Sequence, residues 1–313
     1  MKTQIADWLF LYNTIQQVID KSLNIKLKIF YFTLEMSKEE KMLAAFSNIL
    51  YVKEGIRIAP KDLRSTKADK ILSDENLKLI SKYEPYFQKI EEIVEFIDDI
   101  RNPTGIYKFV RAYAHANGTQ HTKTVNIKGK LTQIDDYYEP NDPEEYVMVF
   151  IDHISLISTE VDGGRKMNLH ESIVKLSSDY LIRLRNKFRY IPVVVQQQAS
   201  AQESVENMKV GRLKPSLDGL GDCKLTQRDA NVILGLFSPF RHEIRDYHGY
   251  DITYFKDNIR FLEILGGREG GGGTICPLFF DGAVNYFKEL PRPMDNDKLS
   301  KVYRFMESTL RKN

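Results

Sequence analysis

A carboxylate or an amide stands directly after each of three apolar segments of this sequence: Glu35, Asp152 and the glutamines of 196–198. A carboxylate held at the end of a buried strand is a suitable ligand for Mg2+, a hard cation that prefers oxygen. Asp152 is therefore a candidate metal ligand, although the same residue could simply cap the turn that follows. Glu35 precedes a predicted helix, so it is either a group with a chemical role or an acid that the helix dipole favours.

The apolar segments before these residues have the length and composition of strands. The run from Val147 to Ile151 is too short for a helix and is typical of a strand buried on both faces of a parallel sheet. Leu27 to Leu34 and Ile191 to Val195 are predicted as further strands, and the second of these is also expected to be buried. In such sheets ligands bind beyond the carboxyl ends of the strands. We therefore expect the two carboxylates and the amides at one edge of the sheet.

Helical segments alternate with these strands. Apolar residues at helical spacing predict one helix from Ile5 to Ile19 and another from Ile173 to Phe188. Ser37-Lys38-Glu39-Glu40 is a capping-box pattern that begins a helix through Leu50, and Asn102-Pro103 begins a helix that ends at Ala116. The predicted fold class is α/β, a mainly parallel sheet with helices on both faces.

The remaining segments surround this core. The stretch at about 52–92 is charged and mostly helical in pattern, whereas 119–146 has no clear period and is predicted to be an irregular or hairpin insertion. A C-terminal amphipathic helix is expected over 297–310. Further strands are expected outside the parallel sheet or at its margin, the last two of them antiparallel: 94–97, 231–237, 261–265 and 275–280.

The composition is that of an ordinary globular chain. Its 313 residues carry a formal net charge of +2, so a site for a polyanion must be a local cluster of basic residues. The two cysteines, Cys223 and Cys276, have neither the spacing of a zinc site nor that of a disulfide framework, which suits a reducing compartment. No apolar run approaches the roughly 18 residues of a membrane span. A cytoplasmic location and no membrane association are expected.

Five segments resemble, in the same order, motifs of the C-terminal RecA-like ATPase domain of phage-type DnaB-like replicative helicases. The likeness covers Lys2 to about Phe287 and is poor at 52–90 and 119–146. The five segments are Tyr31–Ser37, Phe150–Ile157, Ile191–Gln198, Asp218–Val232 and Leu265–Gly270. The resemblance implies a RecA-like P-loop ATPase core that uses ATP and Mg2+.

The resemblance also assigns roles to single residues. Glu35 takes the place of the glutamate that activates the attacking water, and Asp152 that of the Walker B carboxylate. Gln198 matches the glutamine that senses the γ-phosphate. Arg268 matches the arginine finger that reaches the nucleotide of the neighbouring subunit. A polar strand end or a solvated turn is the alternative for each of the last two.

Three departures from the family pattern weaken this assignment. Asn231 replaces a customary aspartate, and Gly266 replaces the lysine that precedes the arginine finger by two positions. Lys2 and Thr3 take the places of the Walker lysine and of the hydroxyl that binds Mg2+, with Met1 where the last glycine of the phosphate-binding loop belongs. We therefore expect a chain truncated within that loop, with poor ATP binding and marginal stability or aggregation on its own.

Two polar loops match those that hold single-stranded DNA in the resembling helicases. The basic residues of these loops are Arg165, Lys166, Lys209, Arg212 and Lys214. Contacts of these residues with DNA phosphates would not depend on sequence. The alternative is that they are ordinary solvated surface. The other partners that the resemblance implies are identical subunits in a hexameric ring, and a primase or helicase loader, in the host cytoplasm if a phage encodes the chain.

Three functions remain open on the sequence. The first is a helicase motor that couples ATP hydrolysis to movement along single-stranded DNA during replication, and the second is another RecA-like ATPase such as a recombinase or loader. The third is a catalytically silent fragment, which the incomplete loop and Gly266 favour. We expect residues 1–292 to form the ATPase domain and 293–313 a helical tail.

Overall fold

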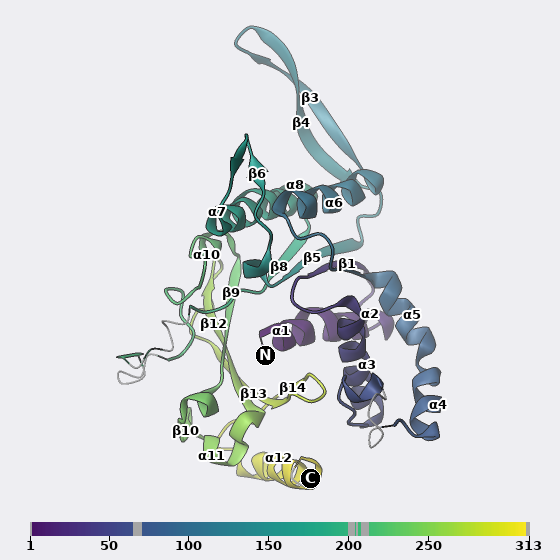
Figure 1. The fold of residues 1–313 in the computed structure, drawn as a ribbon, viewed down its shortest axis with the longest axis vertical. Helices are drawn as coiled ribbons and strands as arrows, with labels where there is room; N and C mark the ends of the chain where they lie inside the picture. The colour runs from purple at the N-terminus through teal and green to yellow at the C-terminus, as the bar shows by residue number, and fades with distance from the viewer. Residues whose placement is uncertain (1, 65–70, 200–203, 205, 208–212, 311–313) are drawn as a thin grey trace. The chain divides into compact units, whose positions relative to one another are not determined.

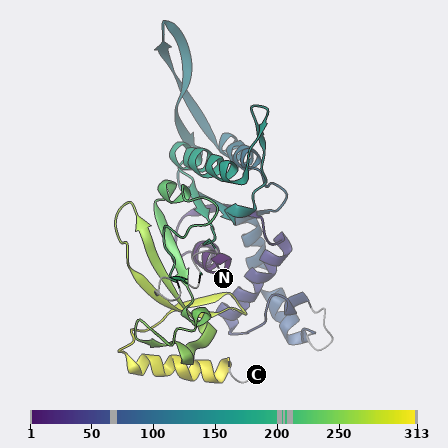
Figure 2. The ribbon, with the colours of Figure 1, turned by 60° about the vertical axis from the view of Figure 1, so that its left-hand side comes forward.

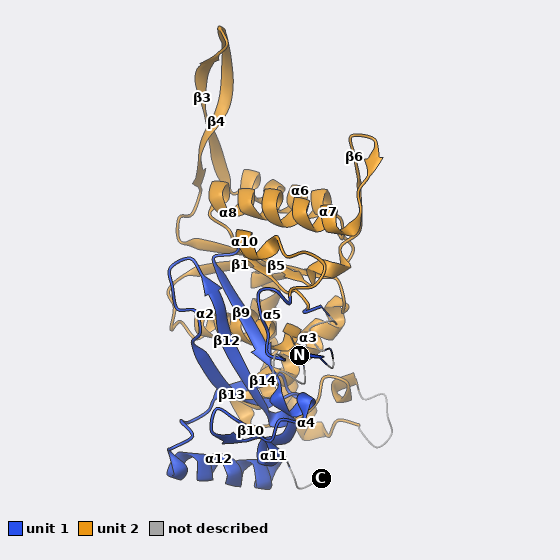
Figure 3. Ribbon diagram, turned by 90° about the vertical axis from the view of Figure 1, so that its left-hand side faces the viewer, with its two compact units in different colours: residues 1, 198–219, 230–313 blue, residues 2–197, 220–229 orange. Residues whose placement is uncertain are grey.

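The computed structural model describes residues 2–64, 71–199, 204, 206–207 and 213–310. The chain divides into two compact units, which Figure 3 colours separately. Unit 2 comprises Lys2–Gln197 and Leu220–Asp229, and unit 1 comprises Gln198–Gly219 and Ala230–Asn313. The chain thus leaves unit 2 after Gln197, returns to it for ten residues, and leaves it again.

Unit 2 is built on a four-stranded parallel sheet. Its strand order is β2-β1-β5-β8, with bounds β1 Lys26–Thr33, β2 Val94–Ile97, β5 Glu145–Asp152 and β8 Ile191–Val194. β1 and β5 pair along their whole length, so that Thr33 lies opposite Asp152 at the carboxyl ends. These two central strands are almost entirely buried because neighbouring strands and helices cover every side.

Helices cover both faces of this sheet (Figures 1 and 2). Alternate residues of β1 point to opposite faces, so Ile29 and Tyr31 pack in one core cluster while Phe30 and Phe32 pack in the other. The first cluster includes helices from the N-terminal part of the unit: α1 Lys2–Asp7, η1 Trp8–Tyr12, α2 Asn13–Ile19, α3 Lys38–Glu54 and α5 Glu84–Ile93. The second includes α6 Pro103–Ala116, α7 Leu169–Val174, η5 Lys175–Leu181 and α8 Ile182–Phe188. The predicted α/β fold class is confirmed.

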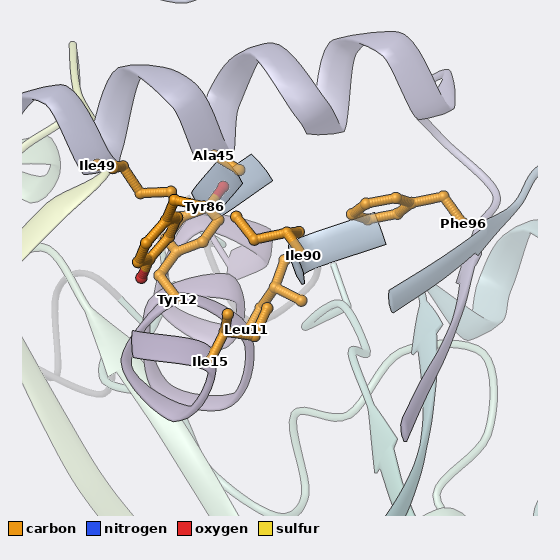
Figure 4. Close-up of a pocket in the computed structure, with 8 residues that line it drawn as sticks. All are labelled: Leu11, Tyr12, Ile15, Ala45, Ile49, Tyr86, Ile90 and Phe96. Carbon is orange, nitrogen blue, oxygen red and sulfur yellow. The ribbon is translucent and has the colours of Figure 1, made fainter. Parts of the chain in front are cut away.

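The predicted helix starts follow the signals in the sequence. Ser37 caps α3 through a complete capping box with Glu40, and Gly55 ends this helix in the left-handed conformation at φ 70°. The first predicted helix forms as α1, η1 and α2 in direct succession, with a π-helical turn in the middle. A small apolar gap remains between α2, α3 and α5 (Figure 4); it is lined by Leu11, Tyr12, Ile15, Ala45, Ile49, Tyr86, Ile90 and Phe96.

The expectation of a buried strand at Ile191 to Val195 was wrong for most of its length. Ile191 and Val194 are 40% and 37% exposed, and only Val195 is buried. The cause is the sheet order, because β8 is the outermost strand and has a single neighbour, β5. Pro192 fits an edge, since proline cannot donate a hydrogen bond to a second neighbour.

Two hairpins interrupt unit 2. The insertion at 119–146 is a long ribbon of β3 Gly118–Ile127 and β4 Lys130–Pro140, joined by the two-residue turn at Lys128 and Gly129. The ribbon projects from its unit and is anchored at its base, where the Tyr138 hydroxyl donates to the Ala114 carbonyl at 2.9 Å (Figure 1). The second hairpin is short, with β6 Val161–Asp162 and β7 Arg165–Lys166. The smaller helices of the unit are η2 Asp62–Arg64, α4 Asp74–Lys82, η4 Ile154–Leu156 and α10 Thr226–Asp229.

Unit 1 is built on an antiparallel sheet, as expected for the C-terminal strands. The strand order is β14-β13-β12-β9, with bounds β9 Val232–Phe237, β12 Ile259–Gly267, β13 Ile275–Asp281 and β14 Tyr286–Glu289. Its other elements are η7 Pro239–His242, β10 Asp246–Tyr247, β11 Tyr250–Asp251, α11 Ile252–Phe255, η8 Lys256–Asn258 and α12 Asn296–Thr309. Leu299 and Met306 of α12 pack into the core of this unit. Among the described helices, none is long and apolar enough to cross a membrane.

Candidate active site

Asp152 and Thr3 lie in contact at the carboxyl edge of the parallel sheet. Asp152 ends β5 and is completely buried, and Thr3 lies in the first turn of α1. The Thr3 hydroxyl donates a hydrogen bond of 2.8 Å to Asp152 Oδ1. A hydroxyl and a carboxylate from residues 149 positions apart thus form one oxygen-rich point at the strand ends.

A buried lysine occupies the other side of the same carboxylate. Lys41 Nζ donates to Asp152 Oδ2 at 2.8 Å, to Asp7 Oδ2 at 3.0 Å and to the Tyr31 hydroxyl at 2.6 Å. The Tyr31 hydroxyl in turn donates to Asp7 Oδ1 at 2.6 Å. The side chains of Lys41 and Asp152 are fully buried, and that of Asp7 is 3% exposed. The sequence motifs did not include Lys41, Asp7 or Tyr31.

A signal in the sequence could have found Lys41. The buried residues of α3 recur at helical spacing, and Lys41 begins the stripe that continues through Ala44, Ala45, Asn48 and Ile49. A charged residue on such a stripe needs a partner inside the protein, because burying an unpaired charge is very unfavourable. The stripe therefore indicates a buried acid somewhere in the fold.

Burial dominates the acid–base properties of this cluster. Burial raises the pKa of Asp7, and the Lys41 ammonium and the Tyr31 hydroxyl oppose that rise only in part. Burial and the two neighbouring carboxylates raise the pKa of Tyr31 well above its ordinary value. Tyr31 therefore keeps its proton and acts as a hydrogen-bond donor.

Glu35 lies at the same edge of the sheet and is exposed. Its carboxylate is 3.9 Å from Nε2 of His153, which follows Asp152 and is itself buried. The same ring nitrogen is 3.3 Å from the side-chain nitrogen of Gln197, just beyond β8. Polar residues after three neighbouring strands, β1, β5 and β8, therefore meet at the place where they were expected.

The three glutamines after β8 differ in their surroundings. Gln196 is committed to structure, since its amide nitrogen donates to the Cys223 carbonyl at 2.8 Å and its amide oxygen accepts from Thr226 at 2.6 Å. Gln197 is the glutamine beside His153. Gln198 belongs to unit 1 and donates to the Ser216 carbonyl at 3.1 Å. Its role as a γ-phosphate sensor remains a prediction.

The other predicted site residues have the following positions. Lys2 is half-buried at the start of α1, and Arg268 is exposed after β12 in unit 1. In unit 2, Arg165 and Lys166 are exposed on β7, and Arg165 forms an ion pair of 2.7 Å with Glu171. Lys214 of unit 1 is exposed and lies 3.3 Å from a carboxylate oxygen of Glu263. Two predicted residues lie outside the described part of the chain: Lys209 and Arg212.

The contact between Thr3 and Asp152 has the chemistry that a Mg2+ ion requires. Both groups offer hard oxygen ligands, and proteins commonly bind Mg2+ through one or two such groups together with water and substrate phosphates. Within the described residues, no cluster of three or more His, Cys, Asp and Glu side chains could hold a metal by itself. Thr3 and Asp152 therefore fit a metal that arrives with a phosphate ligand.

Comparison with known proteins supports the fold. No protein-family model and no curated protein matches this sequence. Among solved structures, the chain is similar to the ATPase domain of a DnaB-like phage helicase, with a TM-score of 0.57 and 16% sequence identity over 90% of this chain and 80% of that chain. The chain therefore has the RecA-like α/β fold of that ATPase domain.

Proposed function

We propose that this chain is the ATPase motor of a DnaB-like DNA helicase, which couples ATP hydrolysis to movement along single-stranded DNA during replication. The observation that carries the proposal is the 2.8 Å hydrogen bond between Thr3 and Asp152 at the carboxyl edge of a RecA-like sheet. In phosphate-transferring ATPases of this class, a hydroxyl after the phosphate-binding lysine and a carboxylate at a strand end hold the same Mg2+ ion. Lys2, Thr3 and Asp152 supply these three groups.

The site residues divide the work of hydrolysis. Lys2 binds phosphate oxygens, while Thr3 and Asp152 hold Mg2+, which when bound neutralises negative charge on the phosphates. Glu35 accepts a proton from the attacking water at its carboxylate, and its exposure leaves it open to that water. Gln198 contacts the γ-phosphate, and Arg268 acts on the nucleotide of an adjacent identical subunit in a hexameric ring.

Single-stranded DNA is the proposed second ligand. Arg165 and Lys166 in unit 2, and Lys214 in unit 1, are exposed cations on the loops assigned to the DNA channel. Lys209 and Arg212 belong to the same proposal. Such residues bind the sugar–phosphate backbone without regard to sequence. Residues 1–292 are the proposed motor domain, with 293–313 as its tail and a primase or loader as a further partner.

ATP turnover with and without single-stranded DNA tests the proposal. Glu35→Gln is expected to lower kcat by about 100-fold or more, because a general base contributes roughly 10²–10⁴-fold, while ATP binding persists. Glu39→Gln is the matched control, since Glu39 is an exposed acid four residues along the same segment. Unchanged turnover in the Glu35 variant would remove Glu35 from the base role.

Two results would change the assignment. A wild-type chain without ATPase activity in the presence of Mg2+ and single-stranded DNA would reject the motor and favour a catalytically silent protein. ATPase activity that DNA stimulates, without separation of a duplex that carries a single-stranded tail, would favour a recombinase or loader.

A further inference from the structure

Lys41 is a fully buried amine that uses all of its hydrogen-bonding capacity. An ammonium group carries three N–H donors, and Lys41 Nζ has three acceptor groups within 3.0 Å: Asp152, Asp7 and Tyr31. Because no N–H remains for water or a ligand, and because the side chain has no exposed surface, Lys41 cannot act on a substrate directly. Any effect of Lys41 on the reaction must pass through the groups that it holds.

The two oxygens of Asp152 have different neighbours. Oδ1 accepts the Thr3 hydroxyl at 2.8 Å, whereas Oδ2 accepts Lys41 at 2.8 Å. Rotation of the carboxylate would exchange the two oxygens and break both hydrogen bonds. Lys41 therefore fixes which oxygen faces Thr3, which is the side that the proposed metal approaches.

Asp7 gives the cluster its net charge. Lys41 and Asp152 alone would form a neutral pair with little attraction for a cation. Asp7 lies 3.0 Å from the same ammonium and adds a second carboxylate, so one formal negative charge remains in the cluster of three. The fixed orientation and the remaining negative charge together suit a cation at Oδ1.

We propose that Lys41 is a positioning residue of the metal site, which holds Asp152 Oδ2 so that Oδ1 stays directed at Thr3 and at Mg2+. This inference rests on the proposed function for the place of the metal. The simpler alternative is a structural ion cluster that only stabilises the packing of α1, α3 and β5. The two differ in whether metal affinity, and not only stability, depends on Lys41.

Binding of Mn2+ to the full chain, followed by electron paramagnetic resonance without nucleotide, separates these alternatives. The informative variant is the double change Lys41→Met with Asp7→Asn, because it keeps one negative charge in the cluster and leaves no carboxylate facing an empty partner. Its Mn2+ affinity is expected to fall by about tenfold, since groups that orient metal ligands typically contribute 10–100-fold. Its thermal midpoint is expected to stay near the wild-type value, whereas Lys41→Met alone is expected to lower it.

Two further variants complete the design. Lys53→Met is the matched control, because Lys53 lies on the same helix and pairs with Asp20 at 2.7 Å but is partly exposed; its Mn2+ affinity should be unchanged. Tyr31→Phe removes a single hydroxyl from the cluster and should weaken Mn2+ binding less than the double change. This variant provides the test if the double variant does not fold.

Three outcomes would overturn the inference: Mn2+ affinity within twofold of wild type in the folded double variant or, if that variant does not fold, in Tyr31→Phe; a Mn2+ site that persists in Asp152→Asn; or no Mn2+ site in the wild-type chain. Because the measurement needs no ATP, its failure is separate from that of the proposed function. A chain without ATPase activity but with a Lys41-dependent Mn2+ site would refute the motor alone. An active ATPase with the first outcome would refute the role of Lys41 alone.

Discussion

Asp152 and Lys41 show which kind of site residue a sequence reveals. Asp152 could be predicted because a carboxylate that interrupts an apolar run marks a strand end, and strand ends of a parallel sheet meet at one edge. Lys41 could not be found by motif, since a lysine in the first turns of a capped helix usually faces solvent. Its partners Asp7 and Asp152 are 34 and 111 residues away, so only the fold brings them together.

Glu160 is a second buried acid whose effect can be measured. Burial raises the pKa of Glu160, but hydrogen bonds from Asn102, Thr104 and Lys175 outweigh this effect and lower the pKa to about 2. Glu160→Gln is therefore expected to reduce the free energy of unfolding at pH 7 by about 1–3 kcal/mol. Urea unfolding of both proteins, followed by circular dichroism, measures the difference.

The pH dependence of this difference has a definite sign. A lowered pKa in the folded state stabilises the protein above the unfolded value near 4.5, and this contribution is lost as the pH falls from there to about 2. The wild type and Glu160→Gln should therefore converge in acid. Glu91→Gln, at an exposed position of α5, should differ little from wild type at any pH. A Glu160 effect that does not change between pH 7 and pH 3 would contradict the assignment.

At the scale of elements, the sequence predicted type and order better than environment. The capping box at Ser37 and the apolar spacing of Ile5 to Ile19 depend on local interactions, so both helices began where expected. Ile191 to Val195 has the composition of a buried strand, yet β8 lies at the edge of its sheet. Which strand becomes the edge depends on the pairing of distant segments, and local composition does not contain that information.

The exposed edge of β8 should promote self-association. Ile191 and Val194 present apolar side chains on the outermost strand of the sheet, which is a template for pairing with another chain. Val194→Lys is expected to reduce aggregation with little loss of stability, because Val194 is already 37% exposed. Light scattering at increasing protein concentration measures this effect.

The control for this prediction is Leu131→Lys on the β3–β4 ribbon. Leu131 is 72% exposed, so the change removes a comparable apolar side chain and adds the same charge away from the β8 edge. An equal decrease of aggregation in both variants would show that net charge, and not the sheet edge, controls association.

At the scale of the whole molecule, a net charge of +2 leaves DNA binding to local clusters. The chain also crosses between its two units at Gln197, Leu220 and Asp229, an arrangement that no local pattern in the sequence predicts. The proposed division at residue 292 stays a prediction. Fold class could be inferred from alternating strands and helices, whereas the partition into units depends on contacts between distant parts of the chain.

Salt dependence tests the proposed DNA contacts. The affinity for single-stranded DNA falls with salt with a logarithmic slope of about 0.7 per phosphate contact. Replacing both Arg165 and Lys166 by Gln should therefore reduce the magnitude of this slope by about 1.4. Fluorescence anisotropy with a labelled oligothymidine between low and moderate salt measures the slope. Lys108→Gln, at an exposed position of α6, should leave it unchanged, and an equal reduction there would argue against a specific contact.

The buried cluster of Lys41, Asp7 and Asp152 also restricts how this sequence can evolve. Loss of Lys41 alone leaves two carboxylates buried beside each other, and loss of Asp7 alone leaves a neutral pair at the metal side. Each single change is therefore selected against, although the two changes together restore the charge balance. Among descendants of this chain, positions 7 and 41 should change together or not at all, and an apolar pair at both positions is the simplest alternative state.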